Sequence, residues 1–306
     1  MKNIKMYKIL KKILCLIIMK YLDCTLRDGG YINNWLFDKN FIKNYICLMN
    51  KIEIDYVEIG FLNNDKQYKD KNVNKIRNID LEYINLFKNN NFKIVVLGDY
   101  KYLNYDLILN SRKIESIHLI RIAFHLIEME PAMVVMDKLK KIGYKVSANA
   151  MGITNYNEND LKKLINYVKE YNIDVLYFAD SYGSLNNNDI QYYINLIENN
   201  FNNFNIGFHL HNNMNNAFSN YEYIKNIKNF KNNIIIDSTL YGMGRGAGNL
   251  QTELVIINNK ININLLIEII IFIIDHVKQY YNVNNNNWGY ELDYLFSGFL
   301  KIHRNY

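Results

Sequence analysis

Two histidines stand two positions apart in one apolar segment, and their spacing is the strongest indication of chemistry in the sequence. His209 and His211 occur in NIGFHLH, which reads as a buried strand. Because alternate residues of a strand point to the same face, both imidazoles share one side. Asp28, after another apolar segment, is the best candidate for a carboxylate partner. Such a set leaves coordination positions open and suits Mn²⁺, Fe²⁺, Co²⁺ or Zn²⁺, with Mg²⁺ also allowed.

Arg27 stands directly beside Asp28. An arginine that faces a reacting oxygen can neutralise developing negative charge, as a reaction that forms an enolate requires. A surface ion pair is the alternative interpretation.

Further polar side chains occur near the ends of other apolar segments. They are candidates for contacts with the substrate or with the two histidines and Asp28: Glu58, His125, Asn149, Asp180 and Ser181.

The segment YGMGRGAGN at 241–249 holds four of the 14 glycines. Glycines at alternate positions allow unusual backbone angles and close approach to a ligand, so Gly244 and Gly246 are candidate substrate contacts. GMGRGA formally satisfies a dinucleotide-binding fingerprint. We reject that interpretation because the segment follows the last predicted strand and no second βαβ half comes after it.

Eight short apolar segments alternate with longer amphipathic ones, and they predict strands. The segments are 20–25, 56–61, 92–98, 116–124, 144–150, 175–180, 205–211 and 233–240. Their continuous apolar character is typical of parallel strands buried on both faces. The alternation predicts an α/β fold, the (β/α)8 TIM barrel, with an open doubly wound sheet as the competing topology. In such a barrel, chemistry occurs at the carboxyl ends of the strands.

Apolar residues at helical spacing predict three of the intervening helices, at 41, 45, 48 and 52, at 161, 164, 165 and 168, and at 190, 193, 194 and 197. Asp38 and Asn157 are the expected N-caps of the first two. A short helix near 250–258 and a longer one near 262–281 are expected to follow the last strand. We therefore expect three parts: an N-terminal extension at 1–18, a catalytic barrel at 19–260, and a C-terminal helix and tail at 261–306.

Composition narrows the function classes. The 36 Lys+Arg exceed the 30 Asp+Glu by a formal charge of +6, but no basic block appears, so we predict no nucleic-acid partner.

The apolar run at 13–19 is too short for a signal sequence or a membrane span, and Met19 could be the true start; a membrane-surface helix is the alternative. Three cysteines, odd in number, favour a reducing cytoplasm.

Six motifs in order resemble one family. They are LDCTLRDGG, YVEIGF, IRIAFH, YFADSYGS, GFHLHNN and DSTLYGMGRGAGNLQTE, over residues 21–255. Together they resemble the metal-dependent, pyruvate-carboxyltransferase-like TIM barrels, which include HMG-CoA lyase, isopropylmalate synthase and homocitrate synthase. IRIAFH, ADSYGS and GMGRGAGN look most like the 4-hydroxy-2-oxovalerate aldolase branch.

The resemblance implies a divalent metal, Mn²⁺ or Mg²⁺ first and Zn²⁺ or Co²⁺ next, held by Asp28, His209 and His211. Asn249 is a further ligand in the lyase branch. Arg27 would stabilise a pyruvate enolate, and Glu58 would order a metal water or the arginine.

Two departures from the family concern the base and the tail. The aldolase branch carries a histidine three residues after the metal aspartate, where this chain has Tyr31, so Tyr31 or His125 is the candidate acid/base. In the bacterial aldolase a longer helical region docks an acylating aldehyde dehydrogenase, and the short tail does not predict that partner. Its aromatic residues could pack on the barrel, form a lid or make a homodimer contact.

The leading hypothesis is an aldol lyase that cleaves or forms a 4-hydroxy-2-oxo acid, giving pyruvate enolate and an aldehyde. One alternative is a Claisen-type enzyme that joins an acyl-CoA to a 2-oxo acid. Another is a barrel that binds a small acid or a partner protein without catalysis, which Tyr31 alone supports.

Overall fold

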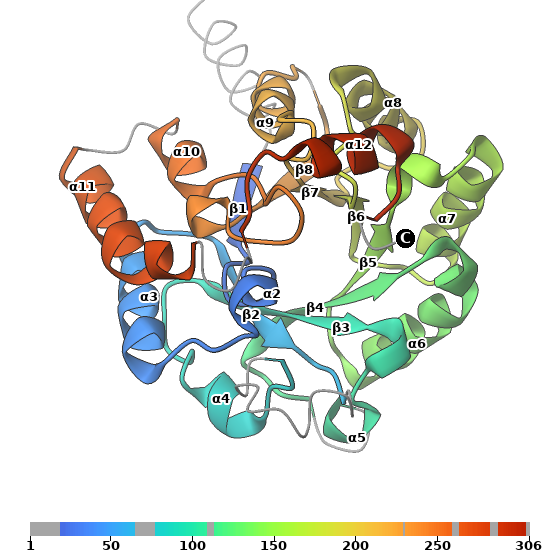
Figure 1. Ribbon diagram of the computed structural model, residues 1–306. Helices are drawn as coiled ribbons and strands as arrows, with labels where there is room; N and C mark the ends of the chain where they lie inside the picture. Colours follow the sequence, from blue (N-terminus) through green and yellow to red (C-terminus); the bar gives the residue numbers. More distant parts are fainter. Residues whose placement is uncertain are drawn as a thin grey trace, which may run out of the picture.

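The computed structural model describes residues 19–64, 77–108, 113–228, 230–258, 263–281 and 287–303. Eight parallel strands pair in sequence order and close into a barrel, because the last strand pairs with the first (Figure 1). The strands are β1 Met19–Asp23, β2 Tyr56–Phe61, β3 Lys93–Asp99, β4 Ile117–Phe124, β5 Val146–Met151, β6 Val175–Asp180, β7 Asn205–Leu210 and β8 Asn233–Ser238. The prediction of a TIM barrel is therefore confirmed, and the open doubly wound sheet is excluded.

Most of the helices surround the barrel and cover the outer face of its strands (Figure 1). The described helices are α2 Gly30–Asn33, α3 Lys39–Lys51, α4 Leu81–Asn85, α5 Tyr105–Ile108, α6 Met129–Ile142, α7 Glu158–Glu170, α8 Asn187–Glu198, α9 Ala217–Lys225, α10 Thr252–Ile257, α11 Ile263–Phe272 and α12 Leu292–Leu300. Within the described chain, every predicted strand lies within two residues of an observed one. The largest differences are two residues each: β1 and β8 end two residues before their predicted ends, and β5 begins two residues after its predicted start.

The three helices predicted from apolar spacing are confirmed as α3, α7 and α8. Asp38 caps α3 by accepting from the Phe41 backbone N–H, and Asn157 caps α7 by accepting from the N–H groups of residues 159 and 160. Each satisfies N–H groups that the first turn leaves without a partner. The predicted helix near 262–281 is α11 followed by a π-helical turn, Ile273–Val277, and a 3-10 turn, Lys278–Tyr280.

The tail after α11 returns to the barrel. Trp288 is buried and donates its indole N–H to the Tyr241 carbonyl in the loop after β8, at 2.8 Å. Helix α12 crosses the carboxyl end of the barrel near β6 and β7 (Figure 1). A Cβ built on Gly298 would lie 3.0 Å from the Tyr182 carbonyl oxygen and 3.0 Å from Met214, so the helix sits close against the loops after those strands.

Residues 1–18 lie outside the described part of the chain, so the predicted extension there stays a prediction, as does the division at 260. Among the described residues, no helix combines the length and apolar character needed to cross a membrane.

Candidate metal centre

Asp28, His209 and His211 meet at the carboxyl end of the barrel. Their ligand atoms all lie within 4.8 Å of one another, and all three side chains are buried. His209 is in β7, and His211 follows the strand on the same face. Asp28 comes from the turn after β1, where the backbone N–H groups of residues 27 and 28 both donate to the Cys24 carbonyl. The predicted set of two histidines and a carboxylate is therefore assembled by two loops and one strand far apart in sequence.

Asn249 completes the arrangement from the glycine loop. The loop folds back so that residue 212 donates to the Gly248 carbonyl and residue 250 donates to the Leu210 carbonyl. This pairing places Asn249 beside His211. The amide of Asn249 donates to Asp28 Oδ2 at 2.5 Å, while its Oδ1 atom is buried with no hydrogen-bond partner among the described residues. A buried acceptor without a donor is what a cation ligand looks like before the cation binds.

Gly244 keeps the space next to these ligands open. A Cβ at this position would lie 2.1 Å from Asn249 Nδ2 and 2.6 Å from Asp28 Oδ2. Any side chain here would therefore occupy the place between the ligand atoms. The unpartnered oxygen, the open cradle and the donor set of two nitrogens and two oxygens fit a divalent metal ion.

The protonation states also suit a cation. Burial lowers the pKa of His211 to about 3, with His209 adding to the effect, so the imidazole is neutral near pH 7. Burial alone would raise the pKa of Asp28, but Arg27 and the two histidines outweigh it and hold this pKa well below its usual range. Metals bind neutral imidazole and ionised carboxylate, and both forms are present at neutral pH.

Arg27 is held by two carboxylates. Its Nε donates to Glu58 Oε2 at 2.6 Å, and its Nη1 pairs with Asp28. The guanidinium also lies over the Phe61 ring, 5.7 Å from the centroid. Since Glu58 is fully buried in β2, the arginine keeps a defined position beside the ligand cluster.

Beneath the ligands lies a layer of polar side chains contributed by every second strand. Glu58, Arg121, Tyr177 and Asp237 come from β2, β4, β6 and β8. Arg121 pairs with Glu58 at 3.1 Å and with Asp237 at 2.6 Å, and its guanidinium lies 4.0 Å from the Tyr177 ring centroid. Barrel interiors are normally filled in such layers by branched apolar residues. Here the layer instead extends the ion pair of Arg27 and Glu58 through Arg121 to Asp237, across the inside of the barrel.

Asp237 joins this layer to the metal ligands. Its Oδ2 lies 3.0 Å from His209 Nδ1. Burial opposes ionisation of Asp237, but Arg121 and His209 lower its pKa, so the carboxylate is ionised and accepts a hydrogen bond from Nδ1–H. The lone pair of His209 is then on Nε2. Cys24, His209 and Asp237 also bring ligand atoms within 4.8 Å of one another. Because Asp237 already bonds to Arg121 and burial raises the pKa of the Cys24 thiol well above its usual range, this second group is a poor cation site.

The two candidate bases lie in different surroundings. Tyr31 is half-buried in the turn that carries Asp28, and its ring packs edge-on against Trp35 and Phe61. His125 is exposed after β4, and its backbone N–H donates to Glu128. Tyr31 therefore lies three residues from Asp28, whereas the described hydrogen bond of His125 is made within its own loop.

The remaining predicted residues have roles in positioning the loops and the buried arginine around the site. Asp180 accepts from the N–H groups of residues 184 and 185, and Ser181 accepts from the Gly152 N–H. Asn149 is buried beside Ser147 and, in the amide orientation that satisfies its neighbours, accepts two hydrogen bonds from Arg121. A Cβ on Gly246 would lie 2.7 Å from Asn213 Oδ1, so this glycine allows the loop to pack on the turn after β7.

Sequence reasoning did not select Arg121, Tyr177 or Arg245. Arg121 could have been found because it is a charged residue in the middle of an apolar strand, and such a residue needs a buried partner. Arg245 lies in the glycine loop, but nothing local distinguishes it from a surface cation.

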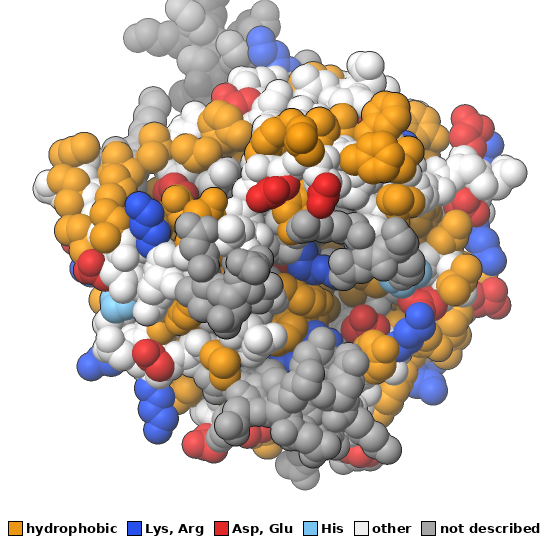
Figure 2. All heavy atoms as spheres, viewed as in Figure 1, with side chains coloured by type: hydrophobic (Ala, Val, Ile, Leu, Met, Phe, Trp, Pro, Cys, Tyr) orange, Lys and Arg blue, Asp and Glu red, His pale blue; other side chains and the backbone are white. Residues whose placement is uncertain are grey.

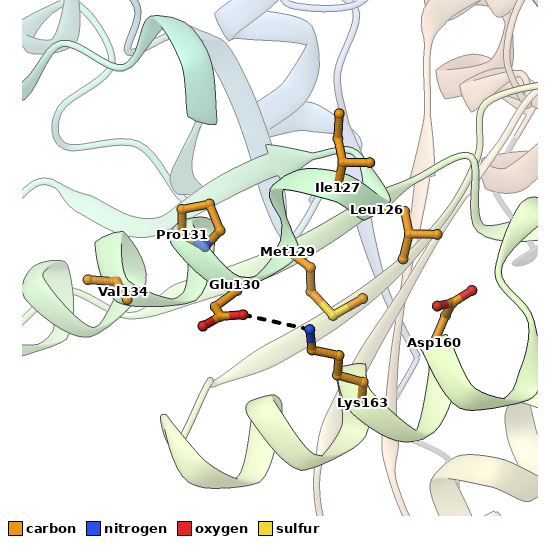
Figure 3. Close-up of a pocket in the computed structure, with 8 residues that line it drawn as sticks. All are labelled: Leu126, Ile127, Met129, Glu130, Pro131, Val134, Asp160 and Lys163. Atoms are coloured by element: carbon orange, nitrogen blue, oxygen red, sulfur yellow. Dashed lines mark ion pairs between the residues drawn. The ribbon is translucent and has the colours of Figure 1, made fainter.

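Figure 2 shows charged side chains set below the surrounding surface near the middle of this face of the molecule. A hollow of about 510 Å³ lies outside the barrel between α6 and α7 (Figure 3). It is lined by residues such as Met129 and Pro131, and Glu130 and Lys163 form an ion pair of 3.6 Å there. None of the candidate metal ligands belongs to it.

Comparisons with known proteins agree with this geometry. The HMGL-like family matches residues 122–269, from β4 to α11. A 4-hydroxy-2-oxovalerate aldolase of Geobacillus thermodenitrificans is 22% identical over 238 residues, covering 76% of this chain and 67% of its own. An oxaloacetate decarboxylase of Mycobacterium tuberculosis is 24% identical over 247 residues, with the same shares covered.

A crystal structure is similar over nearly the whole chain. It is the N-terminal domain of a Bacteroides vulgatus protein provisionally described as an aldolase, with a TM-score of 0.79, 28% identity and 94% of each chain covered. The resemblance drawn from the six motifs agrees with these matches, because the HMGL-like family model covers just under half of the chain, from β4 to α11. The matches support a metal-dependent, lyase-type enzyme.

Proposed function

We propose that the protein is an aldol lyase that cleaves, or in reverse forms, a 4-hydroxy-2-oxo acid. The observation that carries the proposal is the position of Arg27, a buried guanidinium held beside Asp28, His209 and His211. An enolate needs positive charge at its oxygen, and the arginine supplies it in a site with little water.

Asp28, His209 and His211 would hold the divalent metal, with Asn249 as a further oxygen ligand. We expect Mn²⁺ or Mg²⁺, with Zn²⁺ or Co²⁺ able to replace them. When bound, the metal supplies Lewis-acid polarisation of the 2-oxo group.

Side chains of the protein would carry out the proton transfer and stabilise the charge that develops. A base, Tyr31 or His125, removes the proton of the 4-hydroxyl group. The C3–C4 bond then breaks, its electron pair forms the pyruvate enolate, and the 4-hydroxyl carbon leaves as an aldehyde. Arg27 neutralises the enolate oxygen, and Glu58 keeps the guanidinium in place. Protonation of the enolate carbon yields pyruvate, so the reaction needs no oxidant or reductant.

The names of both relatives support the enolate half of this proposal. Decarboxylation of oxaloacetate and cleavage of 4-hydroxy-2-oxovalerate each leave a pyruvate enolate. The residues that stabilise the enolate can therefore be tested with oxaloacetate, whose decarboxylation gives the enolate without an aldehyde. Oxaloacetate decarboxylation is the second candidate reaction.

The test measures pyruvate release from 4-hydroxy-2-oxovalerate and from oxaloacetate by the Mn²⁺-loaded protein, with coupled reduction of the pyruvate. We expect His209→Ala and Asp28→Asn to lower kcat/KM by about 100-fold or more and to lower bound Mn²⁺ in parallel. His276→Ala, at a histidine that contacts Asn44 on the outer helices, should leave both unchanged.

Unchanged turnover and metal content in both ligand variants would refute the aldolase proposal. Thiol release from an acyl-CoA plus a 2-oxo acid would instead support the Claisen-type alternative. Metal binding with no turnover of any 2-oxo acid would support a non-catalytic binding protein.

The cytoplasmic location, a homodimer and the lack of a nucleic-acid or aldehyde dehydrogenase partner remain predictions. Among the described residues, Cys24 and Cys47 are free thiols.

A further inference from the structure

Arg245 lies at the rim of the site, between the loop after β8 and the turn after β1. Its carbonyl oxygen lies 3.3 Å from His211 Nδ1, so its backbone is placed against a metal ligand. Its guanidinium carbon lies 4.9 Å from the centroid of the Tyr31 ring. The side chain is exposed. Arg245 therefore presents a cation at the entrance, on the side of the turn that carries Asp28.

The positive charge of Arg245 is not neutralised by a carboxylate within the part of the chain that the structure describes. Arg27 and Arg121, in contrast, each pair with two carboxylates. The charge of Arg245 also contributes, after burial, to lowering the pKa of His303 in the tail to about 4. The guanidinium of Arg245 thus influences His303 in the tail as well as contacting Tyr31 after β1.

The buried site does not need Arg245 for the 2-oxo acid end of a substrate. Its carboxylates Asp28, Glu58 and Asp237 exceed its guanidiniums Arg27 and Arg121 by one negative charge. A divalent cation and one substrate carboxylate would bring this sum to zero. The positive charge of Arg245 is then not needed inside the buried site and is available for a second anionic group of the substrate.

We propose that Arg245 selects a substrate with a second carboxylate, on the part of the molecule that becomes the aldehyde. This inference rests on the proposed aldol function, because it assigns the pyruvate part to Arg27 and the aldehyde part to the rim. A guanidinium stacked on an aromatic ring keeps its N–H edge available for a planar carboxylate. One cation matches one carboxylate, whereas a phosphate dianion would call for additional donors. The substrate class is a 4-hydroxy-2-oxo dicarboxylic acid.

The first experiment measures binding and needs no turnover. The ligands are 2-oxoglutarate and 2-oxopentanoate, which have the same chain length and differ in the distal carboxylate. Calorimetry on the Mn²⁺-loaded protein should show 2-oxoglutarate binding about 10-fold more tightly. Arg245→Gln should remove this preference, and Arg245→Lys should restore part of it. Lys301→Gln, which removes another cation that donates to the Thr154 carbonyl, is the matched control and should keep the preference.

The second experiment measures condensation of pyruvate with butanal and with succinic semialdehyde, another pair of equal chain length. The wild type should favour the semialdehyde in kcat/KM. Arg245→Gln should lower only that value, by about 10-fold and mainly through KM, and should leave butanal within about threefold.

Equal binding of the two oxo acids by the wild type would overturn the inference, as would an equal loss for both ligands in Arg245→Gln. Competition by inorganic phosphate for the 2-oxoglutarate preference would overturn the choice of a carboxylate. A preference in binding with no condensation of either aldehyde would refute the proposed aldol function and leave the role of Arg245 in anion binding standing.

Discussion

Asp237 bonds both to the buried Arg121 and to His209, a proposed metal ligand, and its two contacts serve different purposes. The contact with Arg121 balances charge inside the barrel, and the contact with His209 fixes the imidazole tautomer. Groups that orient a metal ligand affect metal affinity almost as strongly as the ligands themselves. Asp237 is therefore a positioning residue that lies one layer below the reaction.

Asp237→Asn should weaken Mn²⁺ binding by about 10–100-fold, because an amide can hydrogen-bond to His209 in either tautomer. It should also lower the free energy of unfolding by about 3–5 kcal/mol, because Arg121 loses a buried partner. Competition with a fluorescent chelator measures the affinity, and urea unfolding measures the stability. Glu268→Gln removes a carboxylate from the exposed pair with Lys51 and should change neither. Undiminished Mn²⁺ affinity in Asp237→Asn would show that His209 is oriented by other contacts.

At the scale of elements, the turn after β6 depends on one buried carboxylate. Asp180 accepts from the backbone N–H groups of Ser184 and Leu185, 2.8 and 3.2 Å away. Burial raises the pKa of Asp180 to about 7, although these hydrogen bonds and Lys301 oppose the rise. The carboxyl group thus titrates near neutral pH in the folded protein and near pH 4, its usual value, in the unfolded chain.

The sign of the pH effect follows from these two values. Between about pH 4 and about pH 7 the folded protein binds the proton more tightly than the unfolded chain does, so the contribution of Asp180 to stability is lost as the pH rises. Asp180→Asn should flatten this part of the profile. The measurement compares urea unfolding at about pH 5 and about pH 8. The exposed Asp275→Asn should retain the wild-type slope. An unaltered slope in Asp180→Asn would assign the pH dependence to another group.

Two glycines at the carboxyl end of the barrel allow segments that are far apart in the chain to approach closely. Gly244 leaves room between Asp28 and Asn249, and Gly298 lets α12 approach the loops after β6 and β7. In both cases the missing Cβ decides how closely two segments can pack. Trp288 of the tail packs on the barrel end, whereas Phe296 and Phe299 of α12 are exposed, so a lid or homodimer contact of these aromatic residues stays a prediction.

At the scale of the whole molecule, the barrel closes where β8 meets β1. At this seam between β8 and β1, Asp23 of β1 accepts hydrogen bonds from Tyr45 of α3 at 2.6 Å and from Thr252 of α10 at 2.6 Å. Thr252 Oγ1 also lies 2.8 Å from the Ser238 hydroxyl at the end of β8. One threonine therefore connects the first strand, the last strand and the helix that follows.

Thr252→Val should lower the free energy of unfolding by about 1–3 kcal/mol, because buried Asp23 loses a donor while the side-chain shape is kept. Thr239→Val is the matched control. Thr239 is equally buried, but its hydroxyl has no hydrogen-bond partner among the described residues, so its removal should cost nothing. Urea unfolding of the three proteins makes the comparison. Equal stability of both variants would mean that the seam does not depend on this hydrogen bond.

Much of the fold and the ligand set could be predicted from the sequence because the signals are local. Continuous apolar segments indicate buried parallel strands, and Asp38 and Asn157 cap helices through N–H groups two or three residues away. The spacing of His209 and His211 places both on one face because a strand repeats every two residues. These properties depend on neighbours along the chain.

The partners of the buried charges, in contrast, are decided only by the closed barrel. Asn249 meets Asp28 across 221 positions, Arg121 meets Asp237 across 116, and Arg245 lies over Tyr31 only because the last loop returns to the first turn. No periodicity encodes these pairings, since they follow from strand register and barrel closure. The barrel, the shared face of His209 and His211 and the adjacency of Arg27 and Asp28 can be read from the chain alone. Which groups neutralise the buried charges, and that Arg245 has no carboxylate partner among the described residues, follow only from the folded structure, because charge balance in a dry interior depends on distances in space.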